Sequence, residues 1–152
     1  MSEKKQVLII CRTAEGQMYL DVLLNRLWYA PVLAKTAEEA VRLACTRPFT
    51  LILFDGDLPA SERNAAVSLL RTDSALKASP LVVFMADDDS AVGSALLAQG
   101  CSAVLTKPLD LAIVYGVLAR LSGLPRSTHR VPVKMRVEIA EARDRVADTL
   151  GG

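Results

Sequence analysis

The sequence contains a series of short apolar runs separated by longer helical patterns. Four runs are uninterrupted and bounded by polar or turn residues, at positions 7–10, 51–54, 81–84 and 103–105, and a weaker fifth lies at 32–34. Runs of this length without alternating polar positions are typical of strands that are buried on both faces. The sequence therefore predicts five interior strands.

Helical patterns fill the intervals between these strands. In the first interval Tyr19, Val22, Leu23, Leu27 and Trp28 share one helical face, which we expect to pack on a sheet. Thr36 and Glu39 form a capping box that predicts a helix over residues 37–46. Further helices are expected at 61–71, 90–99 and 110–121. Because strands joined by right-handed helical crossovers become parallel, the pattern predicts a doubly wound α/β domain.

Chemically distinctive residues collect where the predicted strands end. In doubly wound sheets, ligands bind at the carboxyl ends of the strands, beside the point where the strand order reverses. The residues at these ends are Cys11, Arg12, Asp55, Met85 and Lys107. They mark the expected functional crevice.

Composition excludes several classes of function. The 152 residues are 51% hydrophobic, enough for one well-buried core, and 18 lysines and arginines balance 17 acids, so no net charge attracts nucleic acid or an anionic membrane. The apolar run after Gln6 stops at Arg12, too short for a signal peptide, and no stretch approaches the roughly 18 apolar residues of a membrane span. Three widely spaced cysteines fit reduced thiols. We expect a cytoplasmic protein that binds neither nucleic acid nor membrane.

Two segments resemble the receiver domains of bacterial response regulators. LILFDGDLP is similar to the third strand and following loop of that family, with Asp55 at the position of the phosphate-accepting aspartate and Pro59 four residues later. VLTKP is similar to the fifth strand with its lysine–proline pair, Lys107 and Pro108, and 107 − 55 = 52 is the expected spacing. The resemblance covers about residues 6–121. It implies a flavodoxin-like five-stranded parallel sheet of order 2-1-3-4-5 and a cis Lys107–Pro108 bond.

Set against that family, the phosphorylation site is degenerate. Active members hold Mg²⁺ with two acids at the end of the first strand, where this chain has Cys11 and Arg12, and neither supplies a hard oxygen ligand. The hydroxyl residue that meets the phosphoryl group is replaced by Met85, which cannot donate a hydrogen bond, and an inward-turning aromatic residue is replaced by Val104. We therefore expect no bound metal, no catalytic residue and no enzymatic activity.

Charge arithmetic indicates what replaces the metal. Three acids and one lysine sum to −3 + 1 = −2, which matches Mg²⁺, whereas Asp55, Arg12 and Lys107 sum to −1 + 2 = +1. Arg12 would supply an internal cation. The prediction is that Asp55 is an anchor for Arg12 and Lys107 rather than a phosphoacceptor.

The resulting hypothesis is a pseudo-receiver, meaning a receiver domain that docks protein partners without a phosphorylation switch. The alternative is a phosphorylatable receiver of a two-component phosphorelay in which Asp57 and Asp87 serve as substitute Mg²⁺ ligands. Cys11, close to two cations, is either a reactive thiol of low pKa or a small buried residue, and the second is expected.

A composition change after Leu121 predicts a domain boundary, with a receiver-like domain at 1–122 and a basic tail at 123–152. Arg126 and Arg130, followed by VPVKMRVEI, resemble the opening of a PilZ domain, whose arginines bind cyclic di-GMP. The second PilZ motif does not follow before Gly152, so cyclic di-GMP is expected as a ligand only if a full PilZ domain follows in a longer protein. Alternatively the tail has another role, and its apolar positions make homodimerisation one hypothesis.

Overall fold

The computed structural model describes residues 4–123, and these residues form five strands that alternate with five helices. The strands are β1 (Lys5–Ile10), β2 (Tyr29–Ala34), β3 (Leu51–Asp55), β4 (Leu81–Met85) and β5 (Ala103–Thr106). The helices are α1 (Ala14–Arg26), α2 (Ala37–Ala44), α3 (Ala60–Thr72), α4 (Ser90–Ala98) and α5 (Leu111–Ser122). The predicted alternation is confirmed.

The described residues divide into two compact units, one that ends at Lys107 and one that begins at Pro108. The first holds the whole sheet and helices α1 to α4. In the second, Asp110 caps the start of α5, where its carboxylate accepts the backbone N–H groups of Ala112 and Ile113. Gly123, which follows the last residue of α5, has the left-handed conformation with φ of 72°. The predicted boundary at 122/123 stays a prediction, because the PilZ-like residues Arg126 and Arg130 and the proposed dimer segment lie outside the described residues.

All neighbouring strands of the sheet run parallel, in the order β2-β1-β3-β4-β5. This confirms both the doubly wound α/β class and the predicted strand order. Ile10 is paired with Phe54 and Asp55 with Phe84, so β1, β3 and β4 end at the same edge of the sheet. The order reverses between β1 and β3, which places the crevice beside Asp55.

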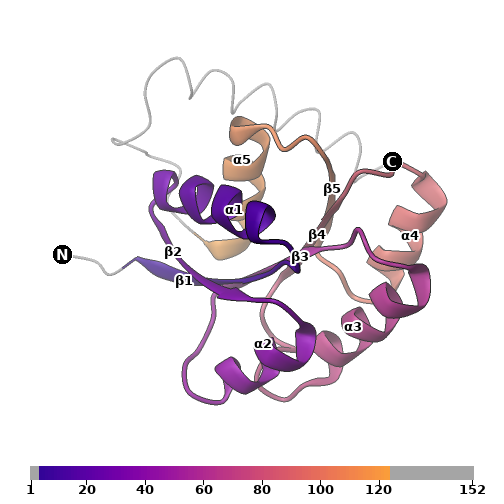
Figure 1. Ribbon diagram of the computed structural model, residues 1–152, viewed down its shortest axis with the longest axis horizontal. Helices are drawn as coiled ribbons and strands as arrows, with labels where there is room; N and C mark the ends of the chain where they lie inside the picture. Colours follow the sequence, from indigo (N-terminus) through magenta and orange to yellow (C-terminus); the bar gives the residue numbers. More distant parts are fainter. Residues whose placement is uncertain (1–3, 124–152) are drawn as a thin grey trace. The chain divides into compact units, whose positions relative to one another are not determined.

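Helices cover both faces of the sheet (Figure 1), with α1 on one face and α2 and α3 on the other. The buried cluster on the second face contains strand residues such as Leu8, Ile52 and Phe54, together with Ala40 of α2 and Leu70 of α3. Each of these five side chains is at most 1% exposed. Continuous burial of this kind is why the central strands have uninterrupted apolar sequences.

The local capping prediction at α2 is confirmed with one difference. Thr36 Oγ1 accepts the backbone N–H of Glu39 at 3.1 Å, as a capping box requires. The carboxylate of Glu39 returns to the N–H of Lys35 at 2.7 Å, one residue before the cap. The helix ends at Ala44, two residues before the predicted end.

The predicted packing face of α1 is wrong by about one position. Tyr19, Val22 and Trp28 are 51%, 53% and 50% exposed, while the buried residues of the helix are Leu20, Leu23 and Leu24. The helix ends at Arg26, and Trp28 has a φ of 67°, which turns the chain directly into β2. None of the helices in residues 4–123 is long and apolar enough to cross a membrane.

Candidate functional site

The crevice is built from the residues that follow β1, β3, β4 and β5. The structure brings Cys11, Asp55, Asp57 and Lys107 into direct contact there. Met85 ends β4 at the same edge, and its carbonyl accepts the backbone N–H of Lys107 at 2.9 Å. Sheet pairing therefore positions the lysine backbone beside β4.

The ammonium of Lys107 lies between two carboxylates of its own chain. Its Nζ is 3.1 Å from Oδ1 of Asp55 and 2.6 Å from Oδ2 of Asp57. The ring of Phe84 lies 5.4 Å below the same ammonium, in the geometry of a cation–π contact. The side chains of Lys107, Asp55 and Asp57 are 32%, 16% and 36% exposed, so the cluster is only partly screened by water.

Asp57 lies in the loop after β3, and both its backbone and its carboxylate form hydrogen bonds there. Its backbone N–H donates to Oδ1 of Asp55 at 3.0 Å, and its own Oδ1 accepts the backbone N–H of Ala86 at 3.0 Å. Partial burial raises the pKa of Asp57, but hydrogen bonds from Lys107 and Ala86 outweigh this and lower it below its usual range. Asp57 is therefore an ionised partner of Lys107.

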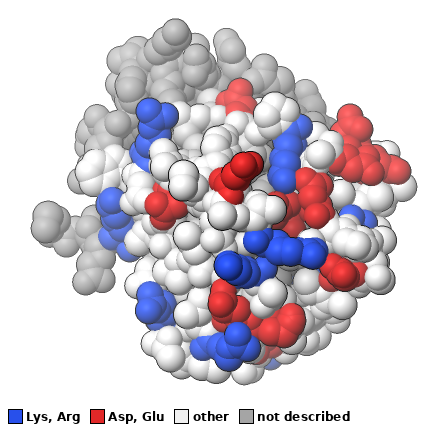
Figure 2. Space-filling model, viewed as in Figure 1, with Lys and Arg blue, Asp and Glu red and all other residues white. Residues whose placement is uncertain are grey.

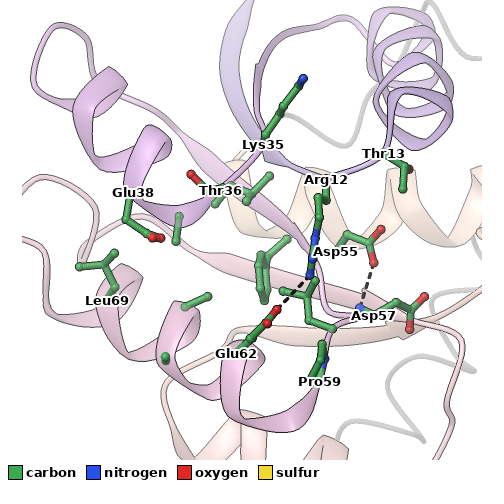
Figure 3. Close-up of a pocket in the computed structure, with 16 residues that line it drawn as sticks. Arg12, Thr13, Lys35, Thr36, Glu38, Asp55, Asp57, Pro59, Glu62 and Leu69 are labelled. Carbon is green, nitrogen blue, oxygen red and sulfur yellow. Dashed lines mark hydrogen bonds and ion pairs between the residues drawn. The ribbon is translucent and has the colours of Figure 1, made fainter.

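Arg12 does not form the predicted ion pair with Asp55. Its Nη2 lies 3.0 Å from Oε2 of Glu62, and the two side chains are 57% and 55% exposed. Figure 3 shows the guanidinium extending past Asp55 to Glu62 in the first turn of α3. The prediction was wrong because Asp55 already has Lys107 as its cation, and because a long exposed side chain can reach a carboxylate on the next helix.

The thiol of Cys11 forms the remaining contact with Asp55. The residue is 2% exposed, and its Sγ lies 3.5 Å from Oδ2 of Asp55. Burial raises the pKa of the Cys11 thiol, hydrogen bonds to Thr13 offset part of that effect, and the Asp55 carboxylate raises it further. The sulfur is thus a protonated donor at neutral pH, which agrees with the expected small buried residue and not with a reactive thiolate.

Met85 and Val104 have packing contacts. Met85 is 3% exposed and belongs to the buried cluster, and Val104 is partly buried against it. The Met85 sulfur also closes the space beside Gly56, where an added Cβ would lie 3.5 Å from Sδ and 2.8 Å from Cγ1 of Val83. A side chain at position 56 would have to displace Val83, so the backbone between Asp55 and Asp57 runs tightly against β4.

A groove of about 830 Å³ opens beside Asp55. Apolar side chains such as Phe54, Leu58 and Leu69 line it, together with the charged residues Arg12 and Glu62. Figure 3 labels Leu69, Arg12 and Glu62 among the lining residues. Small residues on α2 and α3 leave this space open; they are Ala37, Ala65 and Ala66.

The carboxylates at the crevice are engaged by donors of the chain itself. Residues 4–123 contain no group of three or more His, Cys, Asp or Glu side chains that could hold a metal ion. Asp57, one proposed substitute ligand, has both carboxylate oxygens engaged, and the other, Asp87, is exposed and accepts the N–H of Asp89 at 2.9 Å. Mg²⁺ prefers several oxygen ligands in octahedral geometry, and it would have to compete with the ammonium and amide groups that these oxygens now accept.

The Lys107–Asp57 pair makes a pH dependence predictable. Partial burial lowers the pKa of Lys107, but hydrogen bonds to Asp57 and Asp55 outweigh this and raise it. A raised lysine pKa stabilises the fold below the unfolded value of about 10.4, and this contribution is lost as the pH rises through the folded value. The lowered pKa of Asp57 stabilises the fold above about pH 3.9 and is lost as the pH falls through its folded value. In urea unfolding measured across pH, we expect both losses to shrink in Lys107→Met; identical pH profiles would contradict this.

Comparison with known proteins finds solved structures of the same fold, but no matching family model and no matching curated sequence. The receiver domain of the sensor histidine kinase PA1611 from Pseudomonas aeruginosa is similar at a TM-score of 0.69, with 23% identity over 79% of this chain and 98% of that one. Chemotaxis protein CheY4 of Vibrio cholerae has a TM-score of 0.70, with 20% identity over 78% and 98%.

A Chloroflexus aurantiacus protein, whose crystal structure is described as that of a putative response regulator, has a TM-score of 0.71, with 18% identity over 79% of this chain and 98% of its own. These solved structures share the five-stranded order and the alternating helices of this chain. The chain therefore has the α/β fold of response-regulator receiver domains.

Proposed function

We propose that this protein is a pseudo-receiver, a signalling module with the receiver fold that docks protein partners without being switched by phosphorylation. The observation that carries the proposal is at the end of β1, where the Cys11 thiol donates to Oδ2 of Asp55 at 3.5 Å and Arg12 pairs with Glu62, so neither residue offers a carboxylate to Mg²⁺. The positions at which active receivers carry metal-binding acids are Cys11 and Arg12.

Acceptance of a phosphoryl group by a carboxylate requires a free oxygen and a cation that neutralises the incoming charge. At Asp55, Oδ1 accepts from Lys107 Nζ and from the N–H of Asp57, and Oδ2 accepts from the Cys11 thiol. Arg12 is paired with Glu62 and lies outside this set. Both oxygens of the nucleophile are engaged, which supports a structural role for Asp55.

The receiver fold itself does not prevent metal binding. The similar receiver domain of PA1611 was solved with magnesium coordinated in its active-site cleft. Because a protein of the same fold binds magnesium, whether Mg²⁺ binds depends on the residues at the strand ends and not on the topology. Cys11 and Arg12 are the substitutions that support loss of the metal in this chain.

Docking of protein partners fits the surface of the described residues. On the face shown in Figure 2, acidic and basic side chains are interleaved instead of forming one extended charged region. Such a surface recognises a partner by local complementarity and gives no general attraction to a polyanion. Signalling in a two-component pathway follows from the fold of the similar proteins and is part of the proposal.

Incubation of the wild-type chain with acetyl phosphate and Mg²⁺ tests the proposal. We expect an unchanged intact mass, because Cys11 and Arg12 supply no carboxylate for Mg²⁺ and both oxygens of Asp55 already accept hydrogen bonds. The Asp55→Asn variant is the matched control, and a receiver domain that accepts phosphate shows that the reagent is active.

A mass increase of one phosphoryl group in wild type, absent in Asp55→Asn, would instead support the alternative phosphorelay function. In that case Asp57→Asn and Asp87→Asn identify which carboxylate serves as the substitute ligand. Cyclic di-GMP binding by Arg126 and Arg130 stays a prediction outside the described residues.

A further inference from the structure

We propose that the Asp57 carboxylate is a built-in oxyanion, which fills the place beside Asp55 where a phosphoryl group or a free tetrahedral oxyanion would bind. This inference rests on the proposed pseudo-receiver function. It identifies Asp57 as the group that keeps Lys107 and the Ala86 amide engaged when no phosphoryl group is bound.

The geometry around Asp57 is that of a bound anion. Its two carboxylate oxygens have separate donors, the Lys107 ammonium at 2.6 Å and the backbone N–H of Ala86 at 3.0 Å. The donors come from two loops, one after β5 and one after β4. An ammonium and a backbone amide that converge on one anion are the donors proteins use for phosphate and carboxylate groups.

This place adjoins Asp55 directly. Lys107 Nζ is shared by the two carboxylates, and the N–H of Asp57 donates to Asp55 Oδ1 at 3.0 Å. A group carried on Asp55 would therefore meet the ammonium that Asp57 now engages. Ala86 directly follows Met85, the position at which the family resemblance expects a hydroxyl to meet the phosphoryl group. The Asp57 carboxylate competes for these same donors.

Tethering makes Asp57 a strong competitor. Because it is two residues from Asp55 on the same loop, its effective concentration at the site is high, on the order of millimolar or above. Its hydrogen bond to Ala86 also joins the loop before α3 to the loop before α4. The chain thereby fixes the β4–α4 loop with its own carboxylate, where a switchable receiver would need an added anion.

The test compares Asp57→Ala with Asp87→Ala. Both variants remove one acid near the same edge of the sheet, but the Asp87 carboxylate accepts the N–H of Asp89 and has no ion pair with Lys107 among residues 4–123. Hydrogen exchange of the Ala86 amide is followed by NMR, and inorganic phosphate is then titrated into each protein without Mg²⁺. Asp57→Asn, which keeps an acceptor oxygen for Ala86, is the conservative variant.

In Asp57→Ala we expect Ala86 exchange to accelerate by about tenfold, as expected when a single hydrogen bond of this kind is lost. Phosphate should shift the Ala86 amide and slow its exchange again in this variant, and it should leave the Ala86 amide of wild type unchanged. Asp57→Asn should lie between, and Asp87→Ala should behave as wild type.

An unchanged Ala86 amide in Asp57→Ala, or phosphate shifts equal in Asp57→Ala and wild type, would overturn the inference. The readout needs no covalent phosphorylation. Phosphorylation of the wild-type chain by acetyl phosphate would count against the proposed function. The amide measurements test only whether the Asp57 carboxylate occupies the anion-binding place.

Discussion

Replacing Phe54 by alanine is expected to lower the free energy of unfolding by about 3–5 kcal/mol. Phe54 is 1% exposed and lies in the buried cluster between the sheet and helices α2 to α4, next to Asp55 in β3. Removal of its ring takes away buried apolar area and leaves a cavity that surrounding strands can fill only in part. Since small domains are stable by about 5–15 kcal/mol, this one change removes a large share of the total.

Urea unfolding followed by circular dichroism measures the effect of Phe54→Ala. Met18→Ala is the control, because Met18 lies on α1 and is 70% exposed, and its loss should change the stability by about 0.5 kcal/mol or less. Phe54→Leu, which keeps most of the volume, should cost under about 1.5 kcal/mol. Equal midpoints for Phe54→Ala and Met18→Ala would show that the cluster below Asp55 is not a packed core.

Burial explains which strands the sequence predicts well. The central runs, such as those of β3 and β4, are apolar throughout because both faces of the sheet are covered. The edge strand β2 begins at Tyr29, three residues before the predicted run. Its residues from Ala30 to Val32 are only partly buried, so they carry a weaker apolar pattern.

The packing face of α1 was mispredicted because the helix carries two overlapping apolar stripes. Leu23 and Leu27 fit both the predicted stripe with Val22 and the buried stripe with Leu20 and Leu24. Periodicity alone cannot choose between stripes that differ by one position, or about 100° around the helix. Packing against the sheet makes that choice.

At the site, the sequence predicted contacts that are fixed by the strand ends, but not those made by flexible side chains or backbone amides. Strand ends and the resemblance placed Asp55 and Lys107 together, and the structure shows their 3.1 Å contact. The partner of Arg12 was not predictable, since a flexible exposed side chain chooses among acids on several loops. The Ala86 donor was missed as well, because a backbone amide leaves no signal in residue type. The one available signal for Asp57 was its position two residues after Asp55 in the same loop.

The second large effect expected is a gain of metal binding in Arg12→Asp, with affinity for Mg²⁺ at least about tenfold above wild type. Arg12 is a favourable position for the change, since its side chain is 57% exposed and its only ion pair within residues 4–123 is with Glu62 at the surface. Loss of such a pair costs about 0–1 kcal/mol, so the fold should be retained. The new carboxylate follows β1 at the same edge of the sheet as Asp55.

Charge and ligation are separated by a second variant. Over Asp55, Asp57, Glu62, Arg12 and Lys107 the formal charge is −3 + 2 = −1, and it becomes −3 + 1 = −2 in Arg12→Ala and −4 + 1 = −3 in Arg12→Asp. Arg12→Ala attracts a dication more than wild type does but adds no oxygen ligand. Titration calorimetry with MgCl₂ should therefore rank Arg12→Asp first, Arg12→Ala second and wild type last.

Addition of Asp55→Asn to Arg12→Asp identifies the second ligand. If the regained site uses Asp55, the double variant should lose the gain in Mg²⁺ affinity, since an amide is a weaker ligand than a carboxylate for a hard cation. Mg²⁺ binding in wild type as tight as in Arg12→Asp would mean that Asp57 or Asp87 already supplies the missing oxygens. The arginine would then not be the residue that separates this chain from metal-binding receivers, and the pseudo-receiver proposal would lose its electrostatic basis.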